Sequence, residues 1–366
     1  MKPLPKVGII YLTYPTMHWE RDISRFMKSF EKINYPKDRL ELICVESKGE
    51  GERVQPWFEK CWMSKSGNEL PRISYLHNDE WIGFAGNNNI GLAKAKELDC
   101  EYVYLANEDT DTDPHFVMRA VERAELDPNI AIVQSLILLG EERDKINSIG
   151  NAYHYLGFGY SNGYRESAVE YVKDATSHDI NYASGAGMLV RISSLEGEPL
   201  FDEKFYSYHE DTDAGLLARL KGNKVVMEPS SIIYHYYEFG KSKENFFWME
   251  RNRYVLLFSY YKFWTLFLLW PMICCMDAAL FLFSIKSGWW RQKLRVYDEW
   301  IKPEYWRWIK KRRSYIQSVR KLSDKEFLQS AVSRIEFQEP NVKNPVLEKI
   351  GNPVMTLYWG IIGRLL

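Results

Sequence analysis

The sequence Glu-Asp-Thr-Asp occurs twice in the chain, at 108–111 and at 210–213. Each copy puts three carboxylates into four residues and follows an aromatic-rich stretch, YVYLAN before the first copy and YSYH before the second. Two like charges about 4 Å apart repel by roughly 4 kcal/mol at an effective dielectric of about 20. Such a cluster therefore requires a cation, a proton or open water. For either copy alone, solvent-exposed carboxylates that only cap a loop or a helix end are an equally good explanation.

The first copy has the spacing of a calcium loop but lacks its other residues. Asp109, Asp111 and Asp113 alternate as in an EF-hand, where glycine must follow at the sixth position and glutamate at the twelfth. Those positions hold Pro114 and Ala120, which excludes the calcium loop. Magnesium or manganese fits better, since one or two carboxylates hold it while substrate phosphates and water complete its shell. Such an ion neutralises the charge on a departing diphosphate.

The second copy is then free for a different task. A carboxylate at a helix N-terminus can accept the proton of a hydroxyl that attacks the same substrate. One cluster that holds a cation and one that supplies a base would explain why the four residues are repeated.

Alternating strands and helices are expected to position these acids. This alternation predicts an α/β fold with a mostly parallel sheet and right-handed crossovers. Ligands bind beyond the carboxyl ends of such strands, where Glu46, Asp109 and Asp111 fall. The β-rich runs lie at 7–14, 40–47, 72–79, 101–107 and 131–139, and helical patterns separate them.

Later segments continue the pattern. An apolar run at 181–192 indicates a further strand, and the second acidic copy opens a helix that Gly222 ends. Residues 224–237 indicate further strands, with His235 near their end. Trp81 is expected to fill the core rather than to stack on a sugar.

Composition sets few limits on function. The chain has 366 residues and a formal net charge of -1, so global charge indicates no nucleic-acid partner. Its five cysteines form no CxxC pair, which argues against a disulfide framework and a zinc site and favours a reducing cytosol. The first apolar run is too short for a signal peptide and fits a first strand better.

Taken together, these segments resemble a known family. Residues 5–260 are similar to family 2 glycosyltransferases, the inverting GT-A group, and especially to its rhamnosyl- and galactofuranosyl-transferase-like members. Each segment alone is a weak signal, whereas GFAGNNNIG and the FDE…ED block in one chain are a strong one. The resemblance implies a GT-A fold, which is a Rossmann-like α/β sheet with helices on both faces. In chain order the segments are VGIIYLTY, NDEWIGFAGNNNIGLAKA, YLANEDT, YASGAGMLVRI, LFDEKFYSYHEDTDAGLLARLKG, YHYY and MERNRYVLL.

The resemblance assigns roles to the acids. It makes Asp109 the principal metal ligand for Mg²⁺ or Mn²⁺, with Asn107 in the first position of the DXD motif. It makes Asp111 a second candidate ligand and His235 a late ligand of the metal or diphosphate. It makes Asp211 the catalytic base.

The same resemblance places the donor and the acceptor. Glu46 stands where the family usually carries an Asp that contacts the nucleotide base, and its "D-N-x-S" is Glu-Ser-Lys-Gly here, which leaves UDP-, dTDP- and GDP-sugars open. The remaining donor residues are Asn78, Gly83 and Asn88, and the acceptor residues are Gly185, Ala186 and Glu210.

Simpler explanations exist for the same residues. GFAGNNNIG could be only a strand-to-helix loop whose glycines give backbone freedom and whose asparagines cap. His235 alone could be a core histidine, and Gly185 and Gly187 could serve close packing.

The segment 263–285 is apolar and carries one formal charge, Asp277. It is long enough to cross a bilayer, but Asp277 and Pro271 spoil a clean span. The following Trp-rich residues up to 313 are basic, which favours the cytoplasmic headgroup region. A hairpin broken near Pro271, or helices lying in the interface, therefore fit better than a single crossing, and a buried helical pair is the alternative. The end of the chain is too short to cross.

The sequence thus predicts an inverting hexosyl- or rhamnosyl-type glycosyltransferase at the cytoplasmic face of the cell membrane. It would move a sugar to a hydroxyl of a glycan or lipid-linked acceptor and touch the membrane surface through 254–313. The expected parts are a catalytic domain at 1–245, a hydrophobic helical segment at 246–300 and a helical tail at 301–366. The alternatives are a metal-dependent nucleotidyltransferase and a non-catalytic membrane-bound sugar or metal binder.

Overall fold

The computed structural model describes residues 3–15, 18–49, 52–236, 242–336 and 344–366. They form two compact units. Unit 1 takes the described residues within 1–151, 161–206 and 223–237, and unit 2 takes those within 152–160, 207–222 and 238–366. This division differs from the predicted ranges because 152–160 and 207–222 pack with the C-terminal helices. Residue 237, the last of the predicted 224–237 run, lies outside the described residues.

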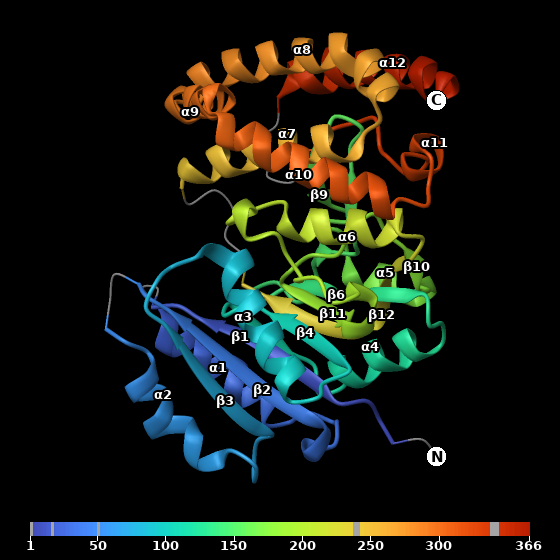
Figure 1. The fold of residues 1–366 in the computed structure, drawn as a ribbon. Coiled ribbons are helices and arrows are strands. Elements are labelled where there is room, and N and C mark those ends of the chain that lie inside the picture. The colour runs from blue at the N-terminus through green and yellow to red at the C-terminus, as the bar shows by residue number, and fades with distance from the viewer. Residues whose placement is uncertain (1–2, 16–17, 50–51, 237–241, 337–343) are drawn as a thin grey trace. The chain divides into compact units, whose positions relative to one another are not determined.

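Unit 1 is built on one mixed sheet (Figure 1). Strands β3, β2, β1 and β4 are parallel neighbours, β11 runs antiparallel between β4 and β6, and β12 is parallel to β6. The predicted mostly parallel α/β sheet is therefore confirmed, with β11 as a reversed strand in its middle. The strands are β1 Val7–Thr13, β2 Leu40–Ser47, β3 Arg72–Asn78, β4 Tyr102–Ala106, β5 Thr110–Thr112, β6 Ile130–Leu139, β7 Ile146–Ser148, β10 His178–Asp179, β11 Gly187–Arg191 and β12 Lys224–His235.

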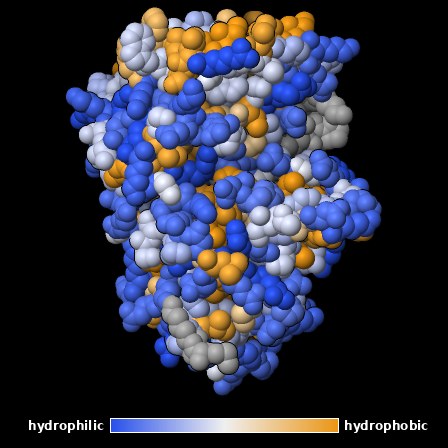
Figure 2. Space-filling view, turned by 90° about the vertical axis from the view of Figure 1, so that its right-hand side faces the viewer, coloured by the Kyte–Doolittle hydropathy of each residue, from blue (hydrophilic) through white to orange (hydrophobic). Residues whose placement is uncertain are grey.

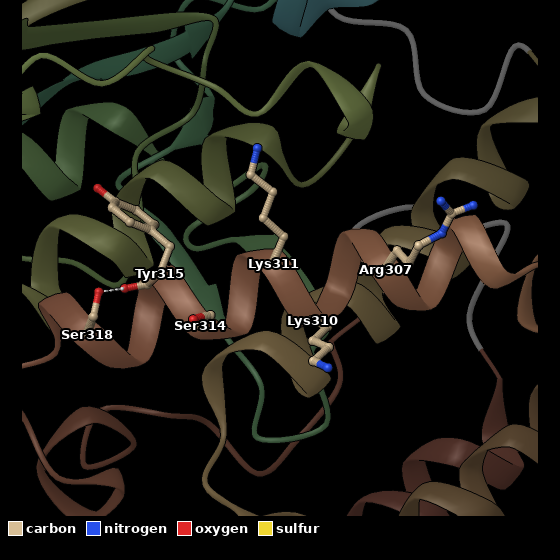
Figure 3. A pocket seen from close by; sticks show the side chains of 6 residues that line it. All are labelled: Arg307, Lys310, Lys311, Ser314, Tyr315 and Ser318. Carbon is tan, nitrogen blue, oxygen red and sulfur yellow. Dashed lines mark hydrogen bonds between the residues drawn. The ribbon is translucent and has the colours of Figure 1, made fainter.

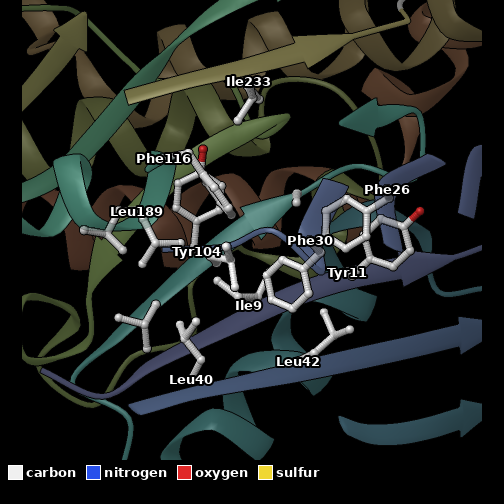
Figure 4. Close-up of a cluster of buried hydrophobic side chains, with 14 of the residues drawn as sticks. Ile9, Tyr11, Phe26, Phe30, Leu40, Leu42, Tyr104, Phe116, Leu189 and Ile233 are labelled. Carbon is white, nitrogen blue, oxygen red and sulfur yellow. The ribbon is translucent and has the colours of Figure 1, made fainter. Parts of the chain in front are cut away.

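Helices pack on both faces of this sheet because successive strand residues point to opposite sides. Tyr11 of β1 stacks on Phe26 of α1 with ring centroids 4.0 Å apart, inside the apolar cluster drawn in Figure 4. Its neighbour Ile10 faces α3, where a Cβ added to Gly91 would come within 2.5 Å of it. The helices of unit 1 are α1 Trp19–Phe30, α2 Gln55–Trp62, α3 Gly83–Glu97, α4 Phe116–Glu125 and α5 Ala168–Asp174.

Unit 2 is mainly helical, as predicted for the C-terminal region. Helix α7 packs against α9 and α10, and α8 packs against α9 and α12. A hairpin of β8 and β9 and the helix α6 join this bundle from earlier in the chain. The elements are β8 Asn151–Tyr153, β9 Gly159–Ser161, α6 Glu210–Leu220, α7 Glu244–Tyr260, α8 Phe263–Lys286, α9 Trp290–Ile301, α10 Pro303–Val319, α11 Asp324–Phe327 and α12 Asn352–Leu365.

Helix α8 runs through Pro271 without a break. The predicted hairpin near Pro271 is therefore wrong. Proline removes the hydrogen bond to the carbonyl four residues earlier, that of Phe267. Both residues are exposed, so the missing bond lies on the outer face of the helix and leaves its packed face intact.

Candidate active site

The polar residues predicted for the donor side meet at one edge of the unit 1 sheet. Strand register puts Glu46 of β2 beside His77 of β3, and Asn107 directly follows the end of β4. The reversed strand β11 begins where β4 ends, since Gly187 pairs with Ala106, so Gly185 and Ala186 precede it at the same edge. The carboxyl end of β12 supplies His235, which pairs with Thr110. Strand ends distant in sequence thus assemble one polar edge.

Asp109 and His235 form an ion pair at this edge. The carboxylate Oδ1 of Asp109 lies 3.0 Å from Nε2 of His235. Burial by itself would lower the pKa of His235, but the Asp109 carboxylate reverses this and raises it; in return the imidazole holds the pKa of Asp109 below its usual range against the effect of burial. The backbone N–H of Tyr236 donates to the Asp109 carbonyl at 2.8 Å and fixes the loop. One imidazole nitrogen and one carboxylate oxygen are therefore held together.

Asp111 has different partners. Its Oδ2 accepts hydrogen bonds from Nη2 of Arg143 at 2.6 Å and from the hydroxyl of Tyr236 at 3.1 Å. Within the described ranges, no three His, Cys, Asp or Glu side chains converge as a metal site. Of the three predicted metal ligands, Asp109 and His235 therefore lie together, whereas Asp111 is paired with Arg143.

Glu108 is the member of the first copy for which the sequence suggested no role. Burial, and then the neighbouring Asp109, raise the pKa of its carboxyl to about 7. Its backbone carbonyl accepts a hydrogen bond from the hydroxyl of Tyr11 at 3.0 Å. The acidic run is therefore anchored to β1 by its main chain.

A cavity of about 260 Å³ opens beside Glu46, over the ends of β2 and β3. Both oxygens of Glu46 accept hydrogen bonds from the protein: from the N–H of Val54 at 2.7 Å, of Gln55 at 3.1 Å and from the Tyr75 hydroxyl at 2.9 Å. Glu46 thereby fixes the start of α2 and one wall of the cavity. The lining residues are Pro15, Glu46, Ser47, Lys48, Gly49, Glu52, Arg53, His77 and Asp79.

Trp81 is not a core residue. It is 37% exposed, and its ring centroid lies 4.7 Å from that of Tyr14. The expectation that it fills the core is therefore wrong. Trp81 lies at the surface after β3. In the sequence, only the polar residues before it (NDE) and the glycine-rich turn after it indicate an exposed position.

The asparagine- and glycine-rich segment orders the turn into α3. Asn78 donates to Oδ1 of Asn87 at 3.2 Å, and Asn88 donates to the carbonyl of Phe84 at 2.9 Å. Gly83 has φ of +79°, and a Cβ there would come within 2.3 Å of the Tyr206 carbonyl oxygen, so only glycine fits. The side chains of Asn78 and Asn88 are thus hydrogen-bonded to protein groups. Backbone groups and neighbouring side chains are left to contact a sugar donor.

The second acidic copy begins helix α6 in unit 2. Asp211 is partly exposed, and its Oδ1 accepts the backbone N–H of Thr212 at 2.6 Å. Glu210 is buried, and burial, followed by the charge of Asp211, raises its pKa well above the usual range. Asp213 is buried against Arg312 and accepts the Tyr260 hydroxyl at 2.8 Å. Asp211 is therefore the accessible carboxylate of this copy.

A strained turn precedes Asp211. Tyr208 and His209 have φ of 66° and 68°, a left-handed conformation that costs non-glycine residues on the order of 1–3 kcal/mol each. Asn252 of α7 holds this turn: its side-chain amide donates to the carbonyls of Ser207 at 3.0 Å and Tyr208 at 2.7 Å, and the residue is fully buried. In the sequence, the segment MERNRYVLL that contains Asn252 carries only a family resemblance. The contact between Asn252 and Tyr208, which are 44 residues apart, cannot be predicted from it.

Unit 2 has a second, wider cavity of about 540 Å³ along one face of α10 (Figure 3). Its lining is basic and hydroxylic, and all of it comes from this one helix. The residues are Arg307, Lys310, Lys311, Ser314, Tyr315 and Ser318. A shallow, positively charged groove of this kind suits an anionic group.

No model of a known protein family and no curated protein matches the sequence. Solved structures do resemble it. GalNAc-T7 with UDP, GalNAc and Mn²⁺ aligns with a TM-score of 0.54 and 13% identity over 71% of this chain. S. aureus TarS with UDP-GlcNAc gives 0.47 and 17%, covering 69% of this chain and 66% of the other. The mannosyltransferase PcManGT from Pyrobaculum calidifontis with GDP-Man and Mn²⁺ gives 0.49 and 14%, covering 87% and 86%.

The chain spans about half, 51%, of the length of the GalNAc-T7 structure. At 13% identity this likeness shows a shared fold, and the fold is the GT-A-like one that the sequence predicted. The helical C-terminal region is present as expected.

Proposed function

We propose that the protein is an inverting glycosyltransferase that moves a sugar from a nucleoside diphosphate to a hydroxyl of a glycan or a lipid-linked acceptor. The observation that carries this proposal is the Asp109–His235 pair at 3.0 Å, on the same sheet edge as the cavity beside Glu46. The fold shared with GalNAc-T7 supports it. Nothing in the geometry favours nucleotidyl transfer or a purely binding role over it.

The pair fits a divalent cation. A carboxylate oxygen and an imidazole nitrogen are both ligands that Mn²⁺ accepts, and Mg²⁺ takes the carboxylate. Asp109 and His235 would hold the ion, with donor phosphates and water completing its shell. When bound, it would offset the negative charge that develops on the departing diphosphate.

The donor's nucleoside would occupy the cavity beside Glu46. Lys48 and Arg53 supply positive charge there, and Glu46 holds the wall in place through its three hydrogen bonds. The backbone around Gly83 and Asn107 would meet the diphosphate sugar. A donor screen can identify which nucleotide binds and whether the sugar is of hexosyl or rhamnosyl type.

Asp211 would act as the base. It would take the proton of the acceptor hydroxyl, whose oxygen attacks the anomeric carbon opposite the diphosphate and inverts the configuration. The N-terminus of α6 stabilises its anionic form, and Asn252 keeps it in place through the turn. Glu210, whose pKa burial raises well above the usual range, would donate a hydrogen bond to the acceptor, and Gly185 and Ala186 of unit 1 are the other proposed acceptor residues.

We keep the cytoplasmic face of the cell membrane as the proposed location. A lipid-linked acceptor with a phosphate would suit the basic groove of α10. Its membrane contact would come from the hydrophobic helices of unit 2.

A donor screen tests the proposal. Purified protein is incubated with Mn²⁺ and UDP-, dTDP- or GDP-sugars, and release of nucleoside diphosphate is measured. One donor should support release, and Asp109→Asn should abolish it. Asp113→Asn is the matched control, because the nearby Asp113 carboxylate contacts His115: it accepts the His115 N–H at 2.9 Å and lies 3.4 Å from the imidazole Nδ1. Metal binding without any nucleotide binding would contradict the proposal.

A further inference from the structure

Helix α8 has two unlike faces. Its packed face is buried at Thr265, Leu269, Met272, Ile273, Met276 and Ser284. Its other face is open to solvent along the whole helix although it is apolar. The large exposed side chains there are Phe263, Trp264, Phe267, Trp270, Leu282 and Ile285, and smaller residues fill the middle.

Buried charges fasten the packed face to α7 and α9. Asp277 accepts hydrogen bonds from the fully buried Lys293 at 2.6 Å and from the hydroxyl of Tyr297 at 2.7 Å. Lys293 also bonds Glu250 at 2.6 Å, which in turn is paired with Arg253 at 2.8 Å. If α8 left the bundle, these charges would lose their partners, which is strongly unfavourable for buried groups. Asp277, which counted against a membrane helix in the sequence, is the anchor of the packed face.

Both ends of α8 are also attached to unit 2. At the start, Asp324 accepts the N–H of Lys262 at 2.7 Å and the hydroxyl of Thr265 at 2.5 Å. At the end, the N–H of Trp289 donates to the Ser284 carbonyl at 2.9 Å as the chain turns into α9. With 24 residues α8 is long enough to cross a bilayer, but a crossing helix needs its two ends on opposite sides of the bilayer, and both ends of α8 are attached to the same unit. The attachments argue for a helix that lies flat.

Helix α12 extends the apolar face. The hydroxyl of Tyr358 donates to the carbonyl of Leu268 at 2.5 Å, which joins the two helices. Figure 2 shows hydrophobic side chains gathered in one band over the end of unit 2 where Figure 1 places α8 and α12. The exposed apolar residues that α12 contributes are Val354, Leu357, Ile361 and Leu365.

The charges around this surface indicate its partner. The exposed stripe of α8 carries no charge between its ends, and lysines stand at both ends, Lys262 and Lys286. Arg291 and Arg364 are exposed at the start of α9 and the end of α12. Tryptophan and flanking basic residues around an apolar strip match the boundary between acyl chains and anionic headgroups.

We propose that the exposed faces of α8 and α12 form a lipid-docking surface, which lies in the plane of an anionic bilayer leaflet and does not cross it. This inference is independent of the sugar chemistry, since it would stand if the active site served another reaction. It replaces the predicted hairpin with two flat helices.

Vesicle flotation tests the proposal with the full chain. We expect binding to vesicles of phosphatidylethanolamine and phosphatidylglycerol and weak binding to phosphatidylcholine alone. The double variant Leu282→Ser with Leu357→Ser should lose at least about tenfold in vesicle affinity. Leu126→Ser is the matched control, because Leu126 is equally exposed but lies in unit 1, and it should bind as the wild type does. Equal binding by the double variant would overturn the proposal, as would self-association through this face without vesicle binding.

Cysteine labelling tests the flat orientation. Cys274 and Cys275 are exposed midway along α8, whereas Cys44 and Cys100 are buried and Cys61 is half-buried. A membrane-impermeant maleimide should label Cys274 and Cys275 in free protein, and anionic vesicles should slow that labelling at least about tenfold while leaving Cys61 unchanged. High salt should weaken binding, because it screens the attraction between the basic residues and the anionic lipids. Unchanged labelling of Cys274 and Cys275, or resistance to extraction by salt and alkali as for a spanning helix, would overturn the proposal.

Discussion

In the two Glu-Asp-Thr-Asp copies, residues at the same position have similar surroundings, although the first copy follows a strand and the second begins a helix. In each copy burial raises the pKa of the glutamate, to about 7 for Glu108 and well above the usual range for Glu210. In each copy the last aspartate is clamped by an arginine and a tyrosine hydroxyl: Asp111 by Arg143 and Tyr236, Asp213 by Arg312 and Tyr260. The proposed chemistry falls on the middle aspartate of each copy, Asp109 or Asp211.

The copies differ in what faces that middle aspartate. Asp109 follows a strand and meets His235, a second metal-type ligand. Asp211 starts a helix after a strained turn, and the N–H of Thr212 binds it. The same four residues are therefore proposed as part of a cation site where strand ends converge, and as the source of a base at a helix start.

The largest expected difference between the two copies is in how much the arginine, Arg312 or Arg143, contributes to the free energy of unfolding. Arg312 and Asp213 are both buried, so Arg312→Met would leave an uncompensated charge and lower the free energy of unfolding by about 3–5 kcal/mol. Arg143 is 52% exposed but its partner Asp111 is only 7% exposed, so Arg143→Met should cost less than Arg312→Met, about 1–3 kcal/mol. Urea unfolding of both variants measures this. Equal losses would show that the two clamps are not distinguished by burial.

The turn before Asp211 should depend on Asn252. Asn252→Ala leaves two carbonyls without their donor and should cost about 2–3 kcal/mol of stability. Because it also frees the turn, kcat should fall while the KM for the donor stays unchanged. Asn352→Ala is the matched control, as it removes a buried amide that donates to the Ile335 carbonyl at 3.1 Å in unit 2. If both variants alter kcat alike, Asn252 has no positioning role.

Acid should weaken unit 2 through His154. Burial lowers the pKa of this histidine to about 3, while an unfolded histidine titrates near 6.5. A depressed pKa means that the unfolded chain binds the proton first, so stability is complete above about pH 6.5 and falls below it. The expected loss is about 2 kcal/mol at pH 5. His154→Asn should flatten the profile between pH 6.5 and 5, and an unchanged slope would assign the titration elsewhere.

The sequence predicted those site residues whose positions depend on where strands end. Asp109 and His235 follow runs whose β character was readable, and parallel strands bring such ends to one edge. It could not predict that Asp111 would be taken by Arg143, 32 residues away in a loop region, or that Asn252 would hold the turn before Asp211. Such pairings depend on how the chain packs, which periodicity does not encode.

The hydrophobic segment 263–285 likewise has a packing partner that periodicity does not predict. Its length and its single Asp277 were evident in the sequence, but the partner of Asp277 is Lys293 on the next helix. Without that pair, Asp277 suggests a defect in a membrane helix. With the pair, it marks the packed face of an unbroken helix.

The separate roles of Asp109 and Asp211 are tested most directly by measuring kcat and donor affinity in one experiment. With Mn²⁺ present, Asp211→Asn should reduce kcat by about 10²–10⁴-fold while the donor binds as it does to the wild type. Asp109→Asn should instead lose Mn²⁺-dependent donor binding. Transfer by Asp211→Asn at the wild-type rate, or unchanged donor binding by Asp109→Asn, would contradict this account.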